Sequence, residues 1–129
     1  MPLLLDSTVL IDFLRGRPVT EKVDRLASSG EMLAVSPVNI EEVVRGLHAG
    51  ESDNARRLFA GLEILPLRQE EAWQSGLWRS QFAAKGVTLS QADCLVAATA
   101  FLAGARLATG NPAHFPMPGL AVEHWPVGR

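Results

Sequence analysis

Short apolar runs alternate with longer segments of helical periodicity along most of the chain. The runs typical of strands lie at residues 3–5, 32–36, 62–66 and 105–109, with a weaker one at 120–123. Segments with the apolar spacing of helices lie at 9–14, 19–27, 39–49, 52–60, 70–85 and 91–103. This alternation predicts strand–helix–strand units, and therefore an α/β fold with a parallel sheet covered by helices on both faces.

The composition is that of one globular domain spanning residues 1–129. Apolar residues make up 47% of the chain and charged residues 20%, which excludes a disordered chain of low hydrophobicity. The longest apolar run, residues 94–105, is shorter than the roughly 18 residues that a membrane span needs. The N-terminus lacks the pattern of a secretory signal, and a single cysteine excludes an internal disulfide. We therefore expect a cytoplasmic protein without membrane association.

Three of the predicted strands end in small polar side chains. Asp6 follows the first strand, Ser36 the second, and Thr109 ends the run at 105–109. The carboxyl ends of parallel strands share one edge of a sheet, which is where open α/β sheets bind their ligands. The Ser7-Thr8 pair after Asp6 is predicted to begin a helix, its hydroxyl groups accepting the first free helical N–H groups.

A second acid leads into the most apolar helix, in the segment LSQADCLVAATAFLAGA (89–105). This helix is apolar nearly all round, so we expect it to be buried, and Asp93 in its first turn is its only acid. Ser90 and Asp93 also have the spacing of a capping box, a structural role that this segment alone favours. An acid at that position nevertheless lies near the sheet edge, so both interpretations stay open.

The segment SPVNIEEVVRGLHAG (36–50) offers two further carboxylates. Its apolar stripe at helical spacing consists of Ile40, Val43, Val44 and Leu47. Glu42 lies on the opposite face, and Glu41 lies between the two faces. Because periodicity does not direct Glu42 into the core, this segment alone favours an exposed glutamate near a helix N-terminus.

Taken together, four features resemble the PIN-domain ribonucleases, and in particular the VapC-type toxins of bacterial toxin–antitoxin pairs. They are the strand ending in DST-VLI, the helix with E-V-V-R-G, the buried helix opened by AD-CLVAA, and AR-LAT-G-N-P-A-HF. The resemblance extends from Leu3 to about Trp125 and includes the closing PMPGLAVEHW. It implies a PIN-like three-layer fold, with a parallel five-stranded sheet flanked by helices, and RNA cleavage that depends on Mg²⁺ or Mn²⁺.

Carried over by position, the family's three metal-binding acids correspond to Asp6, Glu42 and Asp93. Glu42 is preferred to Glu41 because it lies four residues before Gly46. Asn111 corresponds to the fourth catalytic position, where aspartate is usual and asparagine also occurs. Whether one or two cations bind is left open by Asn111. The sequence reads Asp-Ser-Thr where Asp-Thr-Ser is commoner, so it is also open which of Ser7, Thr8 and Thr109 faces the site.

The residue types suit this chemistry. Hard divalent cations bind oxygen ligands, and without a cation three neighbouring carboxylates repel one another, which raises their pKa values. Arg15, Arg17 and Arg45 are candidates to hold RNA phosphates beside the cut. Cys94 lies in an apolar helix and is not expected to act as a nucleophile. His114 is expected to be structural or an outer contact, and Asp12 to be solvated or paired with an arginine.

Two alternative functions remain. DSTVLI also resembles the first strand of haloacid-dehalogenase-like phosphohydrolases, but Thr8 replaces their second aspartate, no lysine follows Lys85, and TGNPAHF contains no acid. The other alternative is a catalytically dead PIN scaffold that binds RNA or a partner, which the asparagine at position 111 would suit. Metal-dependent cleavage of RNA distinguishes both from the ribonuclease.

The resemblance also implies partners: an RNA substrate, a VapB-like antitoxin that covers the site, and a second copy of the chain. A homodimer would use the segment EEAWQSGLWRSQFAAKG (70–86), where Trp73, Leu77, Trp78 and Phe82 offer more apolar surface than one covering helix needs. A helix that simply faces the core is the structural alternative.

Overall fold

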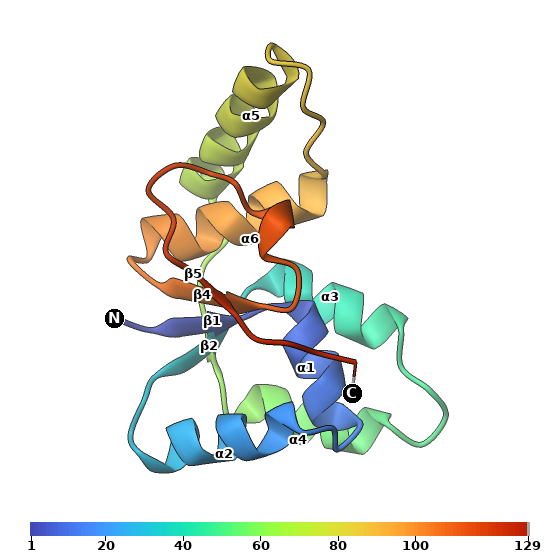
Figure 1. The fold of residues 1–129 in the computed structure, drawn as a ribbon. Helices are drawn as coiled ribbons and strands as arrows, with labels where there is room; N and C mark the ends of the chain where they lie inside the picture. Colours follow the sequence, from blue (N-terminus) through green and yellow to red (C-terminus); the bar gives the residue numbers. More distant parts are fainter. Residues whose placement is uncertain (129) are drawn as a thin grey trace.

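Residues 1–128, which are the residues that the computed structural model describes, form five strands and six helices, with two helices between each of the first three strands and the next (Figure 1). The strands are β1 (Leu3–Leu5), β2 (Leu33–Val35), β3 (Glu63–Ile64), β4 (Arg106–Thr109) and β5 (Val122–His124). The helices are α1 (Ser7–Leu14), α2 (Val19–Ser28), α3 (Pro37–Arg45), α4 (Ser52–Ala60), α5 (Gln69–Ala83) and α6 (Gln91–Leu102), with a 3₁₀ turn, η1, at Pro112–His114. The predicted order of elements is confirmed.

The strands form one parallel sheet in the order β3-β2-β1-β4-β5, as predicted. β1 lies at its centre, with Leu4 opposite Leu107 of β4. Because side chains alternate along a strand, Leu4 packs on one face of the sheet while Leu3 and Leu5 pack on the other. All three are buried, so β1 is anchored from both sides and Asp6 stands at the middle of the carboxyl edge.

Helices cover both faces of the sheet (Figure 1). α6 lies on one face, where Val96 and Ala100 join Leu4 in one apolar core. α1 and α2 lie on the other face, where Val9 and Val23 join Leu3 and Leu5 in a second core. No helix within residues 1–128 is both long and apolar enough to cross a membrane.

α5 packs on α6 rather than on the sheet (Figure 1). Trp78 is buried there, with its ring edge-on to Phe101 at a centroid distance of 5.4 Å. Trp73 and Leu77 on the same helix are 68% and 42% exposed. α5 therefore has both faces that the sequence suggested: a core-facing side at Trp78 and an uncovered apolar side at Trp73.

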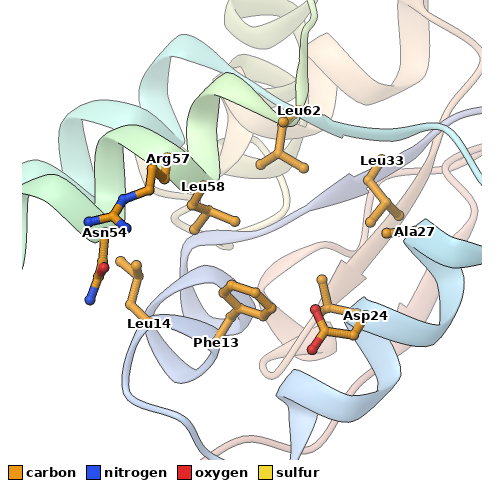
Figure 2. A pocket seen from close by; sticks show the side chains of 11 residues that line it. Phe13, Leu14, Asp24, Ala27, Leu33, Asn54, Arg57, Leu58 and Leu62 are labelled. Atoms are coloured by element: carbon orange, nitrogen blue, oxygen red, sulfur yellow. The ribbon is translucent and has the colours of Figure 1, made fainter.

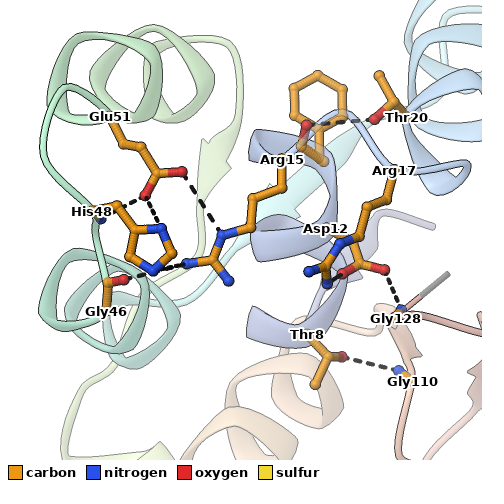
Figure 3. Close-up of polar contacts among 11 residues, drawn as sticks. Thr8, Asp12, Arg15, Arg17, Thr20, Gly46, His48, Glu51, Gly110 and Gly128 are labelled. Atoms are coloured by element: carbon orange, nitrogen blue, oxygen red, sulfur yellow. Dashed lines mark hydrogen bonds and ion pairs between the residues drawn. The ribbon is translucent and has the colours of Figure 1, made fainter.

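α3 ends four residues earlier than predicted, at Arg45 instead of residue 49, with Gly46 in the C-cap position. The chain turns there: the His48 N–H donates to Glu51 Oε1 at 2.5 Å, and Arg15 donates to the Gly46 carbonyl at 3.4 Å (Figure 3). Side chains from outside α3 satisfy these backbone groups, which the periodicity of the segment does not reveal.

The predicted capping role of Ser7 and Thr8 is wrong. α1 begins at Ser7, Asp6 takes the N-cap position, and the Asp6 side chain makes no capping hydrogen bond. The Ser7 hydroxyl donates to Glu42, and the Thr8 hydroxyl oxygen accepts the Gly110 N–H at 3.0 Å (Figure 3). Both hydroxyl groups have partners on other elements, and these tertiary contacts override the local capping preference.

Residues 125–128 follow β5 and reach α1 (Figure 1). The Trp125 N–H donates to the Thr109 carbonyl at 2.8 Å, and the Gly128 N–H donates to Asp12 Oδ2 at 2.7 Å. Asp12 is buried, and its Oδ1 pairs with Arg17 at 2.6 Å (Figure 3). Of the two expectations for Asp12, the ion pair is the one found.

Candidate functional site

Asp6 lies at the centre of the candidate site, and only 7% of it is exposed. Its Oδ2 accepts the Thr109 hydroxyl at 2.7 Å, and its Oδ1 accepts the Asn39 side-chain amide at 3.2 Å. Thr109 reaches Asp6 because β4 runs parallel to β1 with Ala108 opposite Leu5, so the two strands end together. A neighbouring strand and the helix α3 thus each supply a donor to one buried carboxylate.

α3 brings Glu42 to the same edge. Glu42 is half-buried, and its Oε1 accepts the Ser7 hydroxyl at 2.8 Å, whereas Glu41 is exposed. Ser7 directly follows Asp6, so this hydroxyl links Glu42 to the end of β1. The face of α3 opposite the apolar stripe is therefore turned towards Asp6.

Asp93 makes only half of the predicted capping box. Ser90 Oγ accepts the Asp93 backbone N–H at 3.1 Å, as a capping residue should. The Asp93 carboxylate does not reach back to the Ser90 N–H; its Oδ2 lies 3.5 Å from Nδ1 of His114, which is exposed on η1. The backbone N–H of Asp93 therefore takes part in the helix cap, while its carboxylate takes no part in the cap and remains available for other contacts.

The three carboxylates affect one another electrostatically. Burial raises the pKa of Asp6 above its ordinary value, the negative charge of Asp93 raises it further, and the donors Thr109 and Asn39 partly offset this rise. Burial also raises the pKa of Glu42; the Ser7 hydroxyl opposes that, and the charges of Asp6 and Asp93 add to it. The charges of Asp6 and Asp93 therefore act on Glu42, and the charge of Asp93 acts on Asp6, in the direction expected for neighbouring like charges.

Other predicted residues lie around this centre. Asn111 is exposed at the rim, and its backbone N–H donates to Thr109 Oγ1 at 3.0 Å. Burial raises the pKa of the Cys94 thiol, which keeps it protonated and unsuited to nucleophilic attack. All three hydroxyl groups contact residues at the site. The Ser7 hydroxyl donates to Glu42, the Thr109 hydroxyl donates to Asp6, and the Thr8 hydroxyl lies between Asp6 and Gly110.

Two of the three candidate arginines are engaged elsewhere. Arg17 pairs with Asp12. Arg15 lies against the turn after α3, with its Nη2 3.1 Å from His48 Nε2 and its Nε 3.8 Å from Glu51 (Figure 3). Arg45 is exposed beside the site, and its charge lowers the pKa of Glu42. Arg45 is thus the arginine that remains near the carboxylates without an ion-pair partner within residues 1–128.

Asn39 is a site residue that sequence reasoning missed. It is fully buried, and it connects Ser36 at the end of β2 with Asp6 and Ser7 at the end of β1. The available signal was the spacing Ser36-x-x-Asn39 at a strand-to-helix junction, which is a capping box with asparagine in place of glutamate. Nothing in that spacing shows that the amide also reaches Asp6.

The carboxylates suit a hard cation by donor type. Within residues 1–128, no three His, Cys, Asp or Glu side chains already lie in the arrangement of a metal site. Asp6, Glu42 and Asp93 nevertheless offer only oxygen donors. Burial is the main cause of the raised pKa values of Asp6 and Glu42, and the repulsion between carboxylates that adds to it is what a divalent cation relieves. The donor set therefore fits Mg²⁺ or Mn²⁺ and offers no nitrogen or sulfur ligand preferred by softer metals.

Two apolar grooves lie away from the carboxylates, and α4 borders both. One, of about 430 Å³, lies between α1, α2 and α4, and Figure 2 shows Phe13, Leu14, Leu58 and Leu62 facing into it. Asp24 and Arg57 also line it, so charged groups accompany the apolar floor. The other, of about 400 Å³, lies between α3 and α4 and includes Ile40 and Phe59. Neither groove contains a residue of the candidate site.

Comparison with known proteins supports the resemblance found in the sequence. The PIN domain family model matches residues 3–116. The chain is 34% identical over 117 residues to ribonuclease VapC10 of Mycobacterium tuberculosis, covering 89% of this chain and 86% of that one. It is 29% identical over 115 residues to ribonuclease VapC19 of the same organism, covering 88% and 92%. A PIN-type protein is therefore favoured over the haloacid-dehalogenase-like alternative.

Solved structures share the fold over nearly the whole chain. VapBC2 from Rickettsia felis, bound to a DNA fragment from its promoter, superposes with a TM-score of 0.83 at 23% identity, covering 97% of this chain and 99% of that one. FitAcB from Neisseria gonorrhoeae superposes with a TM-score of 0.74 at 28% identity, covering 96% and 97%. The first of these likenesses concerns the fold alone.

The raised pKa of Glu42 predicts a stability effect that depends on pH. A carboxyl group whose pKa is higher in the folded chain favours folding below its unfolded pKa, and this contribution is lost as the pH rises through the folded value. At neutral pH without metal, Glu42→Gln should therefore raise Tm by about 1–3 °C, a small gain because Glu42 is only half-buried. The glutamine oxygen still accepts the Ser7 hydroxyl.

Thermal melts in a chelating buffer between pH 3 and pH 7 would measure this difference. The gain should shrink as the pH falls, because protonation then neutralises Glu42 in the wild type as well. Glu41→Gln on the same helix is the matched control and should show no such trend. Equal behaviour of the two variants would contradict the electrostatic account.

Proposed function

The chain belongs to the PIN domain family, and on that premise we propose that it is a ribonuclease that depends on Mg²⁺ or Mn²⁺ and serves as the toxin of a toxin–antitoxin pair. The observation that carries the proposal is the hydrogen-bonded cluster at the carboxyl edge of the sheet, in which Thr109 and Asn39 donate to the buried Asp6 and Ser7 links Glu42 to the same strand end. The ribonuclease names of the relatives and the toxin–antitoxin complexes among the structural neighbours support it.

Asp6, Glu42 and Asp93 would hold the cation. When bound, Mg²⁺ or Mn²⁺ polarises the scissile phosphate and lowers the pKa of a bound water towards the neutral range. The contribution of the chain is to supply the carboxylates at one edge of the sheet and to stabilise the ionised forms of Asp6 and Glu42. The donors on Asp6 and Glu42 favour the charged form of each group, against the burial that opposes it.

The surroundings also suit an RNA backbone. Arg45 is exposed on α3 beside Glu42, where its guanidinium fork can contact a phosphate next to the cut. Asn111 is exposed directly beyond Thr109 and Gly110, where its side-chain amide would contact the ribose or phosphate of the substrate. Asn111 lacks the charge of an aspartate, so it acts on the substrate side of the site rather than as a strong cation ligand.

The first test separates the two roles of residue 93. Asp93→Asn keeps the backbone N–H that Ser90 caps but removes the charge, so it should fold normally and lose about 100-fold or more in Mg²⁺- or Mn²⁺-dependent RNA cleavage. Ser90→Ala removes the cap and leaves the carboxylate, so it should lose about 0.5–2 kcal/mol of stability and keep most of its activity. RNA cleavage assays and thermal melts of both variants provide the measurement.

Two outcomes would contradict this assignment. Cleavage near the wild-type rate by Asp93→Asn would mean that Asp93 only begins a helix. Failure of the wild type to cleave any RNA with either cation would favour the catalytically dead scaffold that Asn111 suggested.

We also propose that an antitoxin resembling VapB neutralises the chain. A free ribonuclease acting on cellular RNA harms the cell, and the groove between α1, α2 and α4 offers an apolar segment a place to bind. From that groove the antitoxin would reach the carboxylates, where a cationic side chain would be complementary to the negative charge.

Growth measurements test this partner. Expression of the chain alone should slow bacterial growth, and coexpression of the adjacent antitoxin gene should restore it. Ala27→Arg places a long charged side chain in the groove from an exposed position on α2, so it should stay toxic in the presence of the antitoxin. Ser28→Arg, on the next residue and outside the groove lining, is the matched control and should be neutralised. Unchanged growth on expression in several hosts would contradict the toxin.

The exposed apolar side of α5 is our candidate for a homodimer contact. Trp73 borders shallow hollows shared with Leu77 on α5 and with Leu102 on α6, and Leu77 and Leu102 are each 42% exposed. Contiguous exposed apolar residues of this kind mark protein interfaces.

Light scattering checks the dimer. The wild type should show twice the 13.9 kDa chain mass at micromolar concentration, and Trp73→Glu should shift it towards the monomer. Gln81→Glu, which adds the same charge to an exposed position of α5, should leave the dimer intact. A monomeric wild type would exclude this contact.

A further inference from the structure

Asn39 uses every hydrogen-bonding group of its side-chain amide, although it is completely buried. Its Oδ1 accepts the Ser36 backbone N–H at 3.2 Å and the Ser36 hydroxyl at 2.7 Å. Its Nδ2 donates to Asp6 Oδ1 at 3.2 Å and to Ser7 Oγ at 3.0 Å. A buried amide with two acceptor contacts and two donor contacts is fully satisfied, so its position is tightly defined.

The direction of these hydrogen bonds follows from chemistry. The Ser36 backbone N–H can only donate, so the amide oxygen of Asn39 must face it and the NH₂ group must face Asp6. The Ser7 oxygen then accepts from Asn39, and its hydrogen is left to donate to Glu42 Oε1 at 2.8 Å. One amide thus determines the donor presented to Asp6 directly and the donor presented to Glu42 through Ser7.

The same amide joins three separate elements. Ser36 follows β2, Asp6 and Ser7 follow β1, and Asn39 and Glu42 belong to α3. We propose that Asn39 is a positioning residue that sets the mutual placement of Asp6 and Glu42 and thereby controls the affinity of the site for a divalent cation. The inference rests on the proposed function, because it concerns the same carboxylates.

The structural alternative is that Asn39 only caps α3. Its oxygen and the Ser36 hydroxyl form a reciprocal capping box, in which Ser36 Oγ also accepts the Asn39 N–H at 3.1 Å. A capping role requires only the contacts between Asn39 and Ser36, whereas a positioning role also requires the two N–H groups that Asn39 donates to Asp6 and Ser7. Variants that remove one side of the amide network and not the other therefore distinguish the two.

The experiment measures Mn²⁺ binding without RNA, from the electron paramagnetic resonance signal of free Mn²⁺, at a temperature where every variant is folded. Asn39→Ala removes the donors and the cap, and should weaken Mn²⁺ binding by about 10- to 100-fold, the range typical for residues that orient metal ligands. Ser36→Ala removes the capping hydroxyl but keeps the backbone N–H that orients the amide, so its affinity should stay near that of the wild type. Both variants should melt at a lower temperature than the wild type.

Ser7→Ala gives an independent measurement, which decides the question if Asn39→Ala does not fold. It leaves the Asn39 contact with Asp6 in place and removes only the link to Glu42, so it should bind Mn²⁺ more weakly than the wild type and more tightly than Asn39→Ala.

The outcomes separate this inference from the proposed function. Equal Mn²⁺ affinities for the wild type, Asn39→Ala and Ser36→Ala would overturn the positioning role and leave the proposed ribonuclease intact, as would wild-type affinity in Ser7→Ala. Equal losses in Asn39→Ala and Ser36→Ala would reduce Asn39 to a cap. Absence of Mn²⁺ binding by the wild type would overturn the metal-dependent function and the inference together.

Discussion

The structure depends on accommodating the negative charge of Asp6 at the end of β1, its most buried strand. Leu3 to Leu5 are buried on both faces of the sheet, and the backbone they fix delivers Asp6 into a place where water is scarce. An isolated carboxylate there is costly, and two further carboxylates nearby raise that cost. Neutral hydrogen-bond donors, rather than a buried basic side chain, offset this cost. The Thr109 hydroxyl and the Asn39 amide donate to Asp6, and the Ser7 hydroxyl donates to Glu42.

The parallel topology explains why those donors are available. β1, β2 and β4 are neighbours that end at the same edge, so residues far apart in the sequence meet there without a loop having to be built for the purpose. The helices α1 and α3 also begin at that edge, and Asp93 lies in the first turn of α6, so the positive ends of helix dipoles lie near the carboxylates. Asp12 near the C-terminal end of α1 pairs with Arg17 and accepts the Gly128 N–H, which connects the end of this helix to the residues after β5.

The apolar groove between α1, α2 and α4 and the exposed apolar side of α5 are both separate from the candidate site. The helices α1, α2 and α4, which border the apolar groove, lie on one side of the sheet, and α5, which carries the exposed Trp73, lies on the other side, beyond α6 (Figure 1). The carboxylates stand between them at the sheet edge. This separation lets a partner cover the groove or another copy cover α5 while the scaffold that holds Asp6, Glu42 and Asp93 stays the same.

The sequence by itself determined the order of strands and helices, the parallel sheet and the position of Asp6, because alternating apolar periods and strand-end polar residues are local signals. It also determined the cap at Ser90, which needs only four consecutive residues. Whether Glu42 faces the solvent or the site, and what the Ser7 hydroxyl contacts, was decided by tertiary structure, because both depend on how α3 packs beside the end of β1. The same holds for Asn39 and for the early end of α3 at Arg45. The Asp6 partner of Asn39 lies 33 residues away, and Arg15, which donates to the carbonyl of Gly46 at the end of α3, lies 31 residues from that glycine, beyond the reach of any local pattern.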